Sequence, residues 1–442
     1  MKLSGVFLFG LAPENLSNVR HMFQSGAQFM ILVTLVGLVL MRESRQTPIN
    51  ALDESFADFL AINSRRTSEP APVTLVGIDE SSLRERPWPW TPLEFAIFFQ
   101  AAEIFKPAAT ATNEVLHWDA KQMAPDAARK LPQYQKILRE HILRSSKVLV
   151  GAQLGFPEDP TMPPAVQETP LIRNVIGDLS GIPEFTAIEA QADEDFRLSS
   201  VTGFANLPKP ARYTRTAPLV FRYHGQVVPG FVLQAILMWE KLTTDDVTVE
   251  PGVRISLADR VQIPIDREGR MRIDFGVHRR RCGFDDLVLA SDQLENDRTP
   301  IVPREWLSDK LLLLARTDAA AKDVQFAPGR TTSSGELFTA AIGTIQSRSF
   351  IQRAPIWIDY GIVAMMVLIA RACRRWRKFS TLLILLLGTV AYVMLAVTFF
   401  GWSLTWLPII LPAGLAIFIA LFRIATPGVE SPWNVPPKEY RQ

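Results

Sequence analysis

The chain has 442 residues, 48% of them hydrophobic and 21% charged, and its formal net charge at pH 7 is +2. This composition is that of a protein with a large folded region, and the nearly balanced charge gives no support to nucleic-acid binding. The five histidines are scattered, and we find no phosphate-binding loop, nucleophile elbow or paired-histidine zinc motif. We therefore expect no catalytic residue, no metal site and no cofactor, and the chain is not expected to be an enzyme.

An apolar segment at residues 25–41 predicts the first membrane-spanning helix. Residues 29–41 carry no charge, and Arg42 follows them directly. The start of the chain somewhat resembles an export signal, but no small-x-small cleavage site follows the apolar stretch. We therefore expect an uncleaved anchor, with residues 1–24 in the cytoplasm.

Residues 42–354 are predicted to form one extracytoplasmic α/β domain. Its apolar, β-branched runs are typical of buried strands, and the Thr91-Pro92 pair is a good helix start. The elements alternate along the chain, with strands at residues 72–79, 108–115, 147–154 and 310–315 and helices at residues 93–105 and 127–145. This alternation predicts a mixed, mainly parallel sheet with flanking helices.

Other parts of the outer region predict antiparallel pairing and a long insertion. One hairpin is predicted from residues 217–223 and 226–228, and another from residues 261–265 and 270–275. Residues 157–195 are rich in proline and acidic residues, so we expect a surface insertion or lid there.

Three apolar segments near the C-terminus predict a membrane bundle over residues 355–423. The segments cover residues 356–370, 381–400 and 406–422, each about long enough to cross a hydrocarbon core of roughly 30 Å. The basic run at residues 371–378 places the first loop in the cytoplasm, so residues 401–405 form an external loop. Residues 424–442 are then a short cytoplasmic tail, and we expect no catalytic domain after the bundle. Cys282 and Cys373 lie on opposite sides of the membrane in this topology and cannot form a disulfide.

The order of motifs resembles the type-2 CHASE domain. The motifs are residues 76–79 (VGID), 88–90 (WPW), 203–206 (GFAN), 264–273 (PIDREGRMRI), 309–314 (DKLLLL) and 335–336 (GE), with Arg215, Pro218, Asp323 and Pro328 between them. The resemblance covers about residues 45–423, including one span before the domain and three after it. It implies an extracytoplasmic sensory domain of a bacterial receptor, located in the cytoplasmic (inner) membrane.

The chain departs from this family pattern at three places. It has Asn113-Glu114 where the family usually has an aspartate, and Ala315-Arg316 where the family usually has a glycine. It has Glu336-Leu337-Phe338-Thr339 where the family often has Glu-x-His-Ala. If these positions form the family's pocket, the resemblance implies either a different ligand or a lost pocket.

Six residues are candidates for ligand binding. Asp79 and Glu80 follow a buried strand, at the edge where α/β folds bind ligands, and Trp88 and Trp90 could stack on a ligand. The other two candidates are Arg215 and Asp323, which the positions of the family's motifs imply as polar partners of the same site. The alternatives are that Asp79 caps the next turn and that the tryptophans only pack. The basic run at residues 278–281 could hold phosphate or carboxylate groups, or be a solvated loop.

Two hypotheses for function follow. In the first, the outer domain binds a small molecule or an envelope component and signals through a separate partner protein. In the second, the chain is a structural or interaction subunit of a membrane assembly and has no ligand. The basic loop and the tail could contact a partner, and a homo-oligomer is compatible with either hypothesis.

Overall fold

The computed structural model describes residues 26–46, 50–63, 69–156, 170–208, 213–373 and 378–425. The predicted N-terminal region (residues 1–24), most of the tail and part of the basic loop lie outside the described residues, as do residues 157–169 of the predicted insertion. The chain forms two compact units, one of residues 1–60 with 352–442 and the other of residues 61–351.

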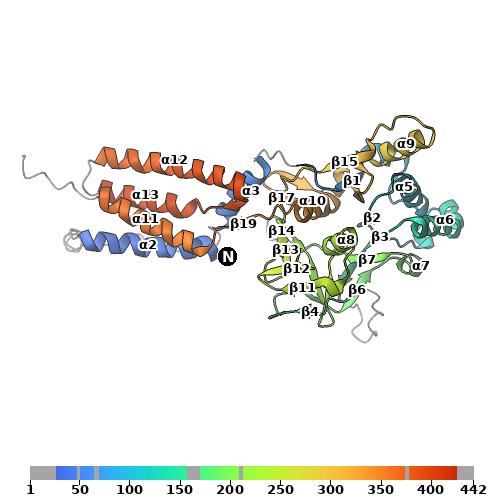
Figure 1. Cartoon of the computed structure of the whole chain (residues 1–442), viewed down its shortest axis with the longest axis horizontal. Helices are drawn as coiled ribbons and strands as arrows, with labels where there is room; N and C mark the ends of the chain where they lie inside the picture. Colours follow the sequence, from blue (N-terminus) through green and yellow to red (C-terminus); the bar gives the residue numbers. More distant parts are fainter. Residues whose placement is uncertain are drawn as a thin grey trace, which may run out of the picture. The chain divides into compact units, whose positions relative to one another are not determined.

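The first unit is a bundle of apolar helices (Figure 1). Its helices are α2 (Gly26–Gln46), α11 (Ile356–Cys373), α12 (Lys378–Ser403) and α13 (Ile410–Ala425), joined by most of α3 (Asn50–Asn63). Helix α11 and residues 379–403 of α12 are long and apolar enough to cross a membrane, whereas α13 is shorter. The predicted loop at residues 401–405 is shorter than expected, because α12 continues through Ser403.

The second unit contains a sheet of seven described strands, which confirms the predicted α/β fold. The strand order is β15-β1-β16-β2-β3-β6, and β7 also pairs with β3. Every pair is parallel except β3–β6. The bounds are β1 (Val73–Ile78), β2 (Ala109–Thr112), β3 (Val148–Gly155), β6 (Ala187–Ala190), β7 (Val201–Phe204), β15 (Arg280–Gly283) and β16 (Leu311–Arg316).

Helices cover both faces of this sheet, as the leucine run of β16 requires. Leu311 and Leu313 belong to one apolar core, and Leu312 and Leu314 belong to the other, because successive side chains of a strand point to opposite faces. The first core contains α8 (Phe231–Glu240) and α10 (Ser334–Gln346), and the second contains α5 (Pro92–Phe105), α6 (Pro125–Arg144) and α9 (Phe284–Glu295).

Smaller sheets are built from the second half of the unit and from the predicted insertion. The first predicted hairpin is confirmed in its inner part, where β9 (Val220–Tyr223) pairs with β10 (Gln226–Pro229) across His224 and Gly225, both at positive φ. The remaining short strands are β4 (Asn174–Val175), β5 (Glu184–Phe185), β8 (Thr216–Pro218), β11 (Val247–Glu250), β12 (Arg254–Leu257), β13 (Val261–Pro264), β14 (Arg270–Arg272), β17 (Val324–Ala327) and β18 (Arg330–Thr332).

One prediction for this region is wrong. Residues 261–265 and 270–275 do not form a hairpin, because β13 pairs with β12 and β14 pairs with β8. The turn between β12 and β13 places Ala258 and Asp259 at positive φ without any glycine, so it gave no turn signal. The described part of the predicted insertion is also more regular than expected, since β4, β5 and β6 each pair with a strand elsewhere.

Candidate functional site

Asp79 and Glu80 lie where β1 ends, at the carboxyl edge of the parallel sheet. One Asp79 oxygen accepts hydrogen bonds from the backbone N–H groups of Ser81 and Ser82, both at 3.1 Å, so Asp79 caps the short helix α4 (Glu80–Glu85). Although partial burial acts in the opposite direction, hydrogen bonds from the two serines hold the pKa of Asp79 below its ordinary value. Glu80 accepts a hydrogen bond from the Ala319 N–H at 2.9 Å, which links the ends of β1 and β16.

The two tryptophans have different surroundings. Trp88 is half-buried, and the Arg316 guanidinium lies 4.8 Å from the centroid of its ring. Trp90 is only 2% exposed and packs against Phe95 and Phe284, while its indole N–H donates to the Arg86 carbonyl at 2.9 Å. Trp88 therefore lies with Asp79 and Glu80 at the sheet edge, whereas Trp90 belongs to the core beneath it.

Arg215 and Asp323 lie in another part of the fold. Arg215 directly precedes β8, and its guanidinium lies 5.2 Å from the centroid of the Tyr213 ring. Asp323 is exposed and directly precedes β17. The Gln325 carbonyl of β17 accepts a hydrogen bond from the N–H of Thr214, the residue before Arg215. These two residues are near the β17–β18 hairpin rather than the sheet edge.

The sheet edge also holds Arg316 and Glu114, which were noted in the sequence only as departures from the family pattern. Arg316 donates two hydrogen bonds, at 2.9 and 2.8 Å, to the buried carboxylate of Asp318. Burial raises the pKa of Glu114, which follows β2, and this effect is partly offset by Arg316. The edge is thus a network of the chain's own charges around Arg316.

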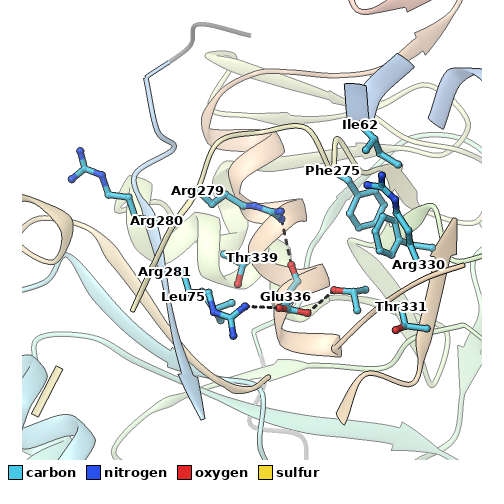
Figure 2. Close-up of a pocket in the computed structure, with 12 residues that line it drawn as sticks. Ile62, Leu75, Phe275, Arg279, Arg280, Arg281, Arg330, Thr331, Glu336 and Thr339 are labelled. Atoms are coloured by element: carbon cyan, nitrogen blue, oxygen red, sulfur yellow. Dashed lines mark hydrogen bonds and ion pairs between the residues drawn. The ribbon is translucent and has the colours of Figure 1, made fainter. Parts of the chain in front are cut away.

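A cavity of about 320 Å³ lies beside this network and is lined by arginines (Figure 2). Its walls come from β1, β15, the β17–β18 hairpin, α10 and the last turn of α3. The lining residues are Ile62, Leu75, Phe275, Arg279, Arg280, Arg281, Phe326, Arg330, Thr331, Thr332, Glu336 and Thr339. The structure thus places the three arginines of the basic run, Arg279, Arg280 and Arg281, in the wall of a cavity.

The strand geometry of β15 decides which arginines point into the cavity. Arg281 is paired in register with Leu75 of β1, and both face α10. Because side chains alternate along a strand, Arg280 points to the other face, where it donates to the Glu305 carbonyl at 2.8 Å and lies over the Trp306 ring. In Figure 2, Arg279 and Arg281 turn towards Glu336, and Arg280 turns away.

Glu336 is the single carboxylate in the cavity wall among the described residues. Its Oε2 accepts hydrogen bonds from the Thr332 hydroxyl at 3.0 Å and the Ser333 N–H at 3.1 Å. The Ser333 hydroxyl in turn accepts from the Glu336 N–H at 3.2 Å, which completes the capping box of α10. The Glu336 Oε1 accepts from Arg281 at 3.0 Å. Gly335 allows α10 to pack closely against β16, because a Cβ at residue 335 would lie 2.0 Å from the Cβ of Ala315. The Gly335-Glu336 motif therefore has a packing role and a capping role.

Part of the cavity wall is apolar. Phe275 and Phe326 stack with ring centroids 4.4 Å apart, and Ile62 and Leu75 line the same cavity. Thr331 and Thr332 add hydroxyl groups. An arrangement of guanidinium groups, hydroxyl groups and an aromatic wall can bind a small molecule that is polar at one end and apolar at the other.

A family model of the CHASE2 domain matches residues 31–373. Comparison with curated proteins gave no match, and neither did comparison with solved structures.

Proposed function

Because the chain belongs to the CHASE2 domain family of extracytoplasmic sensory domains, we propose that it is a membrane-anchored sensor that binds a small molecule in the arginine-lined cavity. The cavity carries this proposal. Its volume of about 320 Å³ is within the range of roughly 300–1,000 Å³ found for small-molecule sites. It also combines converging polar groups with an apolar wall, as such sites do.

Membrane anchoring is supported by the surface of the helical bundle. Helix α12 exposes large apolar side chains along its length, including Leu386 at 62% and Met394 at 63%. A continuous apolar surface of this kind is unfavourable in water but suited to lipid. We propose four spans in the cytoplasmic membrane of a bacterium, formed by α2, α11, α12 and α13, with the sensory domain outside.

We propose that helix α3 carries the signal from the cavity towards the membrane. Ile62, in the last turn of α3, lines the cavity. Asp53, earlier in the same helix, accepts hydrogen bonds from the N–H groups of Ile409 and Ile410 at the start of α13. A change in α3 on ligand binding would then bias the bundle, and a separate partner protein would receive the change.

The residues at the sheet edge are a second proposed location for the ligand. Asp79 and Glu80 lie there at the end of β1, and the half-exposed Trp88 ring, next to Arg316, is available to a ligand. Glu80→Gln and Trp88→Ala would test this location. If both variants keep the wild-type ligand affinity while remaining folded, the ligand does not bind at the edge.

A thermal-shift screen of the purified full chain would test ligand binding. The chain in detergent is heated with each member of a panel of envelope metabolites, and a ligand that binds only the folded state raises the melting temperature (Tm) by mass action. At least one compound should raise Tm in a saturable way, and Thr331→Val should weaken that response. A panel without any saturable response would favour the alternative, a structural or interaction subunit without a ligand.

Partner signalling has its own test. Cross-linked membranes should yield a specific second protein, and loss of that protein should reproduce the phenotype of losing this chain. Recovery of copies of this chain alone would argue for a homo-oligomer and against a separate partner.

A further inference from the structure

We infer that the ligand of this cavity is a small anion with an apolar body, a carboxylate or phosphate monoester attached to a group about the size of one aromatic ring. This inference rests on the proposed function, because it assumes that the cavity binds a ligand. It adds the chemical class and the residues that select it.

The first argument is the charge of the cavity. Arg279, Arg281 and Arg330 contribute three guanidinium charges to the wall. Glu336 in the wall and the buried Asp274 near Arg279 provide two carboxylates, so one positive charge is left over. The cavity wall therefore carries a net positive charge, which attracts an anionic ligand.

The second argument is that the carboxylate of the cavity wall is fully occupied, whereas an arginine of the wall is only weakly hydrogen-bonded. Glu336 already accepts from Arg281, Thr332 and Ser333, so it has little capacity left to pair with another arginine. Arg279 donates to the Glu336 backbone carbonyl at 3.4 Å, which is a long hydrogen bond to a neutral acceptor.

Arg330 has the most donors to offer a ligand. No ion pair joins Arg330 to any residue in the described part of the chain, and its side chain is exposed at the cavity mouth on β18. Burial lowers the pKa of Arg279, but an arginine keeps its charge in proteins. The planar donors of two arginines suit bidentate binding of a carboxylate or phosphate.

The third argument is the apolar part of the cavity wall. The stacked rings of Phe275 and Phe326 and the side chains of Ile62 and Leu75 add apolar surface to the same cavity. A bare inorganic anion would leave this surface wet. A cavity of about 320 Å³ has space for one ring and one anionic group.

The experiment uses the purified full chain in detergent and four probes: phenyl phosphate, phenylacetate, inorganic phosphate and benzyl alcohol. Ionic strength is held constant with sodium chloride, because surface electrostatic effects depend on salt. Phenyl phosphate and phenylacetate should raise Tm in a saturable way, inorganic phosphate should do so more weakly, and benzyl alcohol should have little effect. The dissociation constants follow from the dependence of Tm on probe concentration.

Three arginine variants locate the effect. Arg330→Gln should weaken phenyl phosphate binding by about tenfold, the size expected for one lost charge-assisted contact. Arg298→Gln makes the same change at an exposed arginine that does not line the cavity, so the affinity should stay at the wild-type value. Arg330→Lys keeps the charge and should restore part of the affinity.

The outcomes separate this inference from the proposed function. Equal affinities of Arg330→Gln and Arg298→Gln would mean that the anions bind elsewhere, and the inference would be wrong. If the anionic probes have no effect but a neutral metabolite from the screen stabilises the chain, the anion class is wrong and the sensor proposal stands. If the probes and the whole panel leave Tm unchanged, both proposals fail.

Discussion

The Asp53 carboxylate accepts a hydrogen bond from the backbone N–H of Ile410 at 3.0 Å, which joins helix α3 to the first turn of α13. The same oxygen accepts from the Ile409 N–H at 2.9 Å, so it satisfies two donors at a helix N-terminus. Arg353 lies 3.9 Å from both Asp53 and Asp359, and its guanidinium stacks over the Trp406 ring. One arginine therefore lies between two buried carboxylates.

Asp53→Ala should destabilise the helical unit. Asp53 is 1% exposed, and its loss leaves two helix-terminal N–H groups without their acceptor and removes one partner of Arg353. Losing a cap and breaking a buried pair should together cost about 2 kcal/mol or more. Thermal unfolding in detergent should show a lower Tm, and Leu52→Ala at an exposed position of the same helix provides the control. An unchanged Tm for Asp53→Ala would contradict the assigned role of the cap.

Stability should depend on pH through Asp53. Burial raises the pKa of Asp53 above its ordinary value of 3.8, and Asp359 adds to this, while the Ile410 and Ile409 N–H groups and Arg353 act against it. The folded state therefore binds this proton more tightly than the unfolded state does. The resulting stabilisation is fully present below pH 3.8 and is lost as pH rises through the raised pKa.

The comparison of wild type with Asp53→Asn isolates this effect. The Tm of the wild type relative to the variant should fall as pH is raised from about 4, and then become constant once the raised pKa has been passed. Other carboxylates titrate in both proteins and cancel in the difference. A difference that is flat, or that rises with pH, would show that burial does not dominate the Asp53 environment.

Gly335→Ala should destabilise the sensory domain. The added methyl group would lie 2.0 Å from the Cβ of Ala315, a fully buried residue of β16, so strand and helix would have to separate. Overpacking of this kind costs about 1–3 kcal/mol. Gly343→Ala on the same helix meets its nearest atom, of Val277, at 3.3 Å, and should be tolerated better. Urea unfolding followed by circular dichroism would rank the two variants, and equal loss would contradict the packing argument.

The sequence predicted the central fold well because its core strands carry strong local signals. The run of four leucines in β16 and the apolar run of β1 could hardly be anything but strands buried on both faces. The N-terminal cap of α5 was predicted for the same reason, and Thr91 forms a capping box with Glu94. The β9–β10 turn was recognisable because it contains Gly225.

The cavity could not be predicted, because it depends on which way side chains point and on residues far apart in the sequence. A run of three arginines gives no indication that Arg279 and Arg281 face a cavity unless residues 280–283 are known to be a strand. Phe326 and Arg330 come from a hairpin with weak strand signals, and Ile62 comes from a helix nearly 270 residues earlier in the chain. Register and tertiary contacts, which no local pattern encodes, bring them together.

Membrane topology can be tested with single cysteines. Both native cysteines are buried, and burial raises the pKa of Cys282 to about 12, so it should react slowly in the folded protein. In a variant with both replaced by serine, Val253→Cys lies at an exposed position of the sensory domain, and Arg371→Cys lies at an exposed position in the last turn of α11.

A membrane-impermeant maleimide should label Val253→Cys in intact spheroplasts and should label Arg371→Cys only after the membrane is permeabilised. The physical reason is the density of arginine and lysine at residues 371–378, which holds that loop on the cytoplasmic side. The serine double variant without an added cysteine controls for background, and labelling after solubilisation controls for accessibility. Labelling of Arg371→Cys but not Val253→Cys in intact spheroplasts would reverse the topology and place the arginine-lined cavity in the cytoplasm.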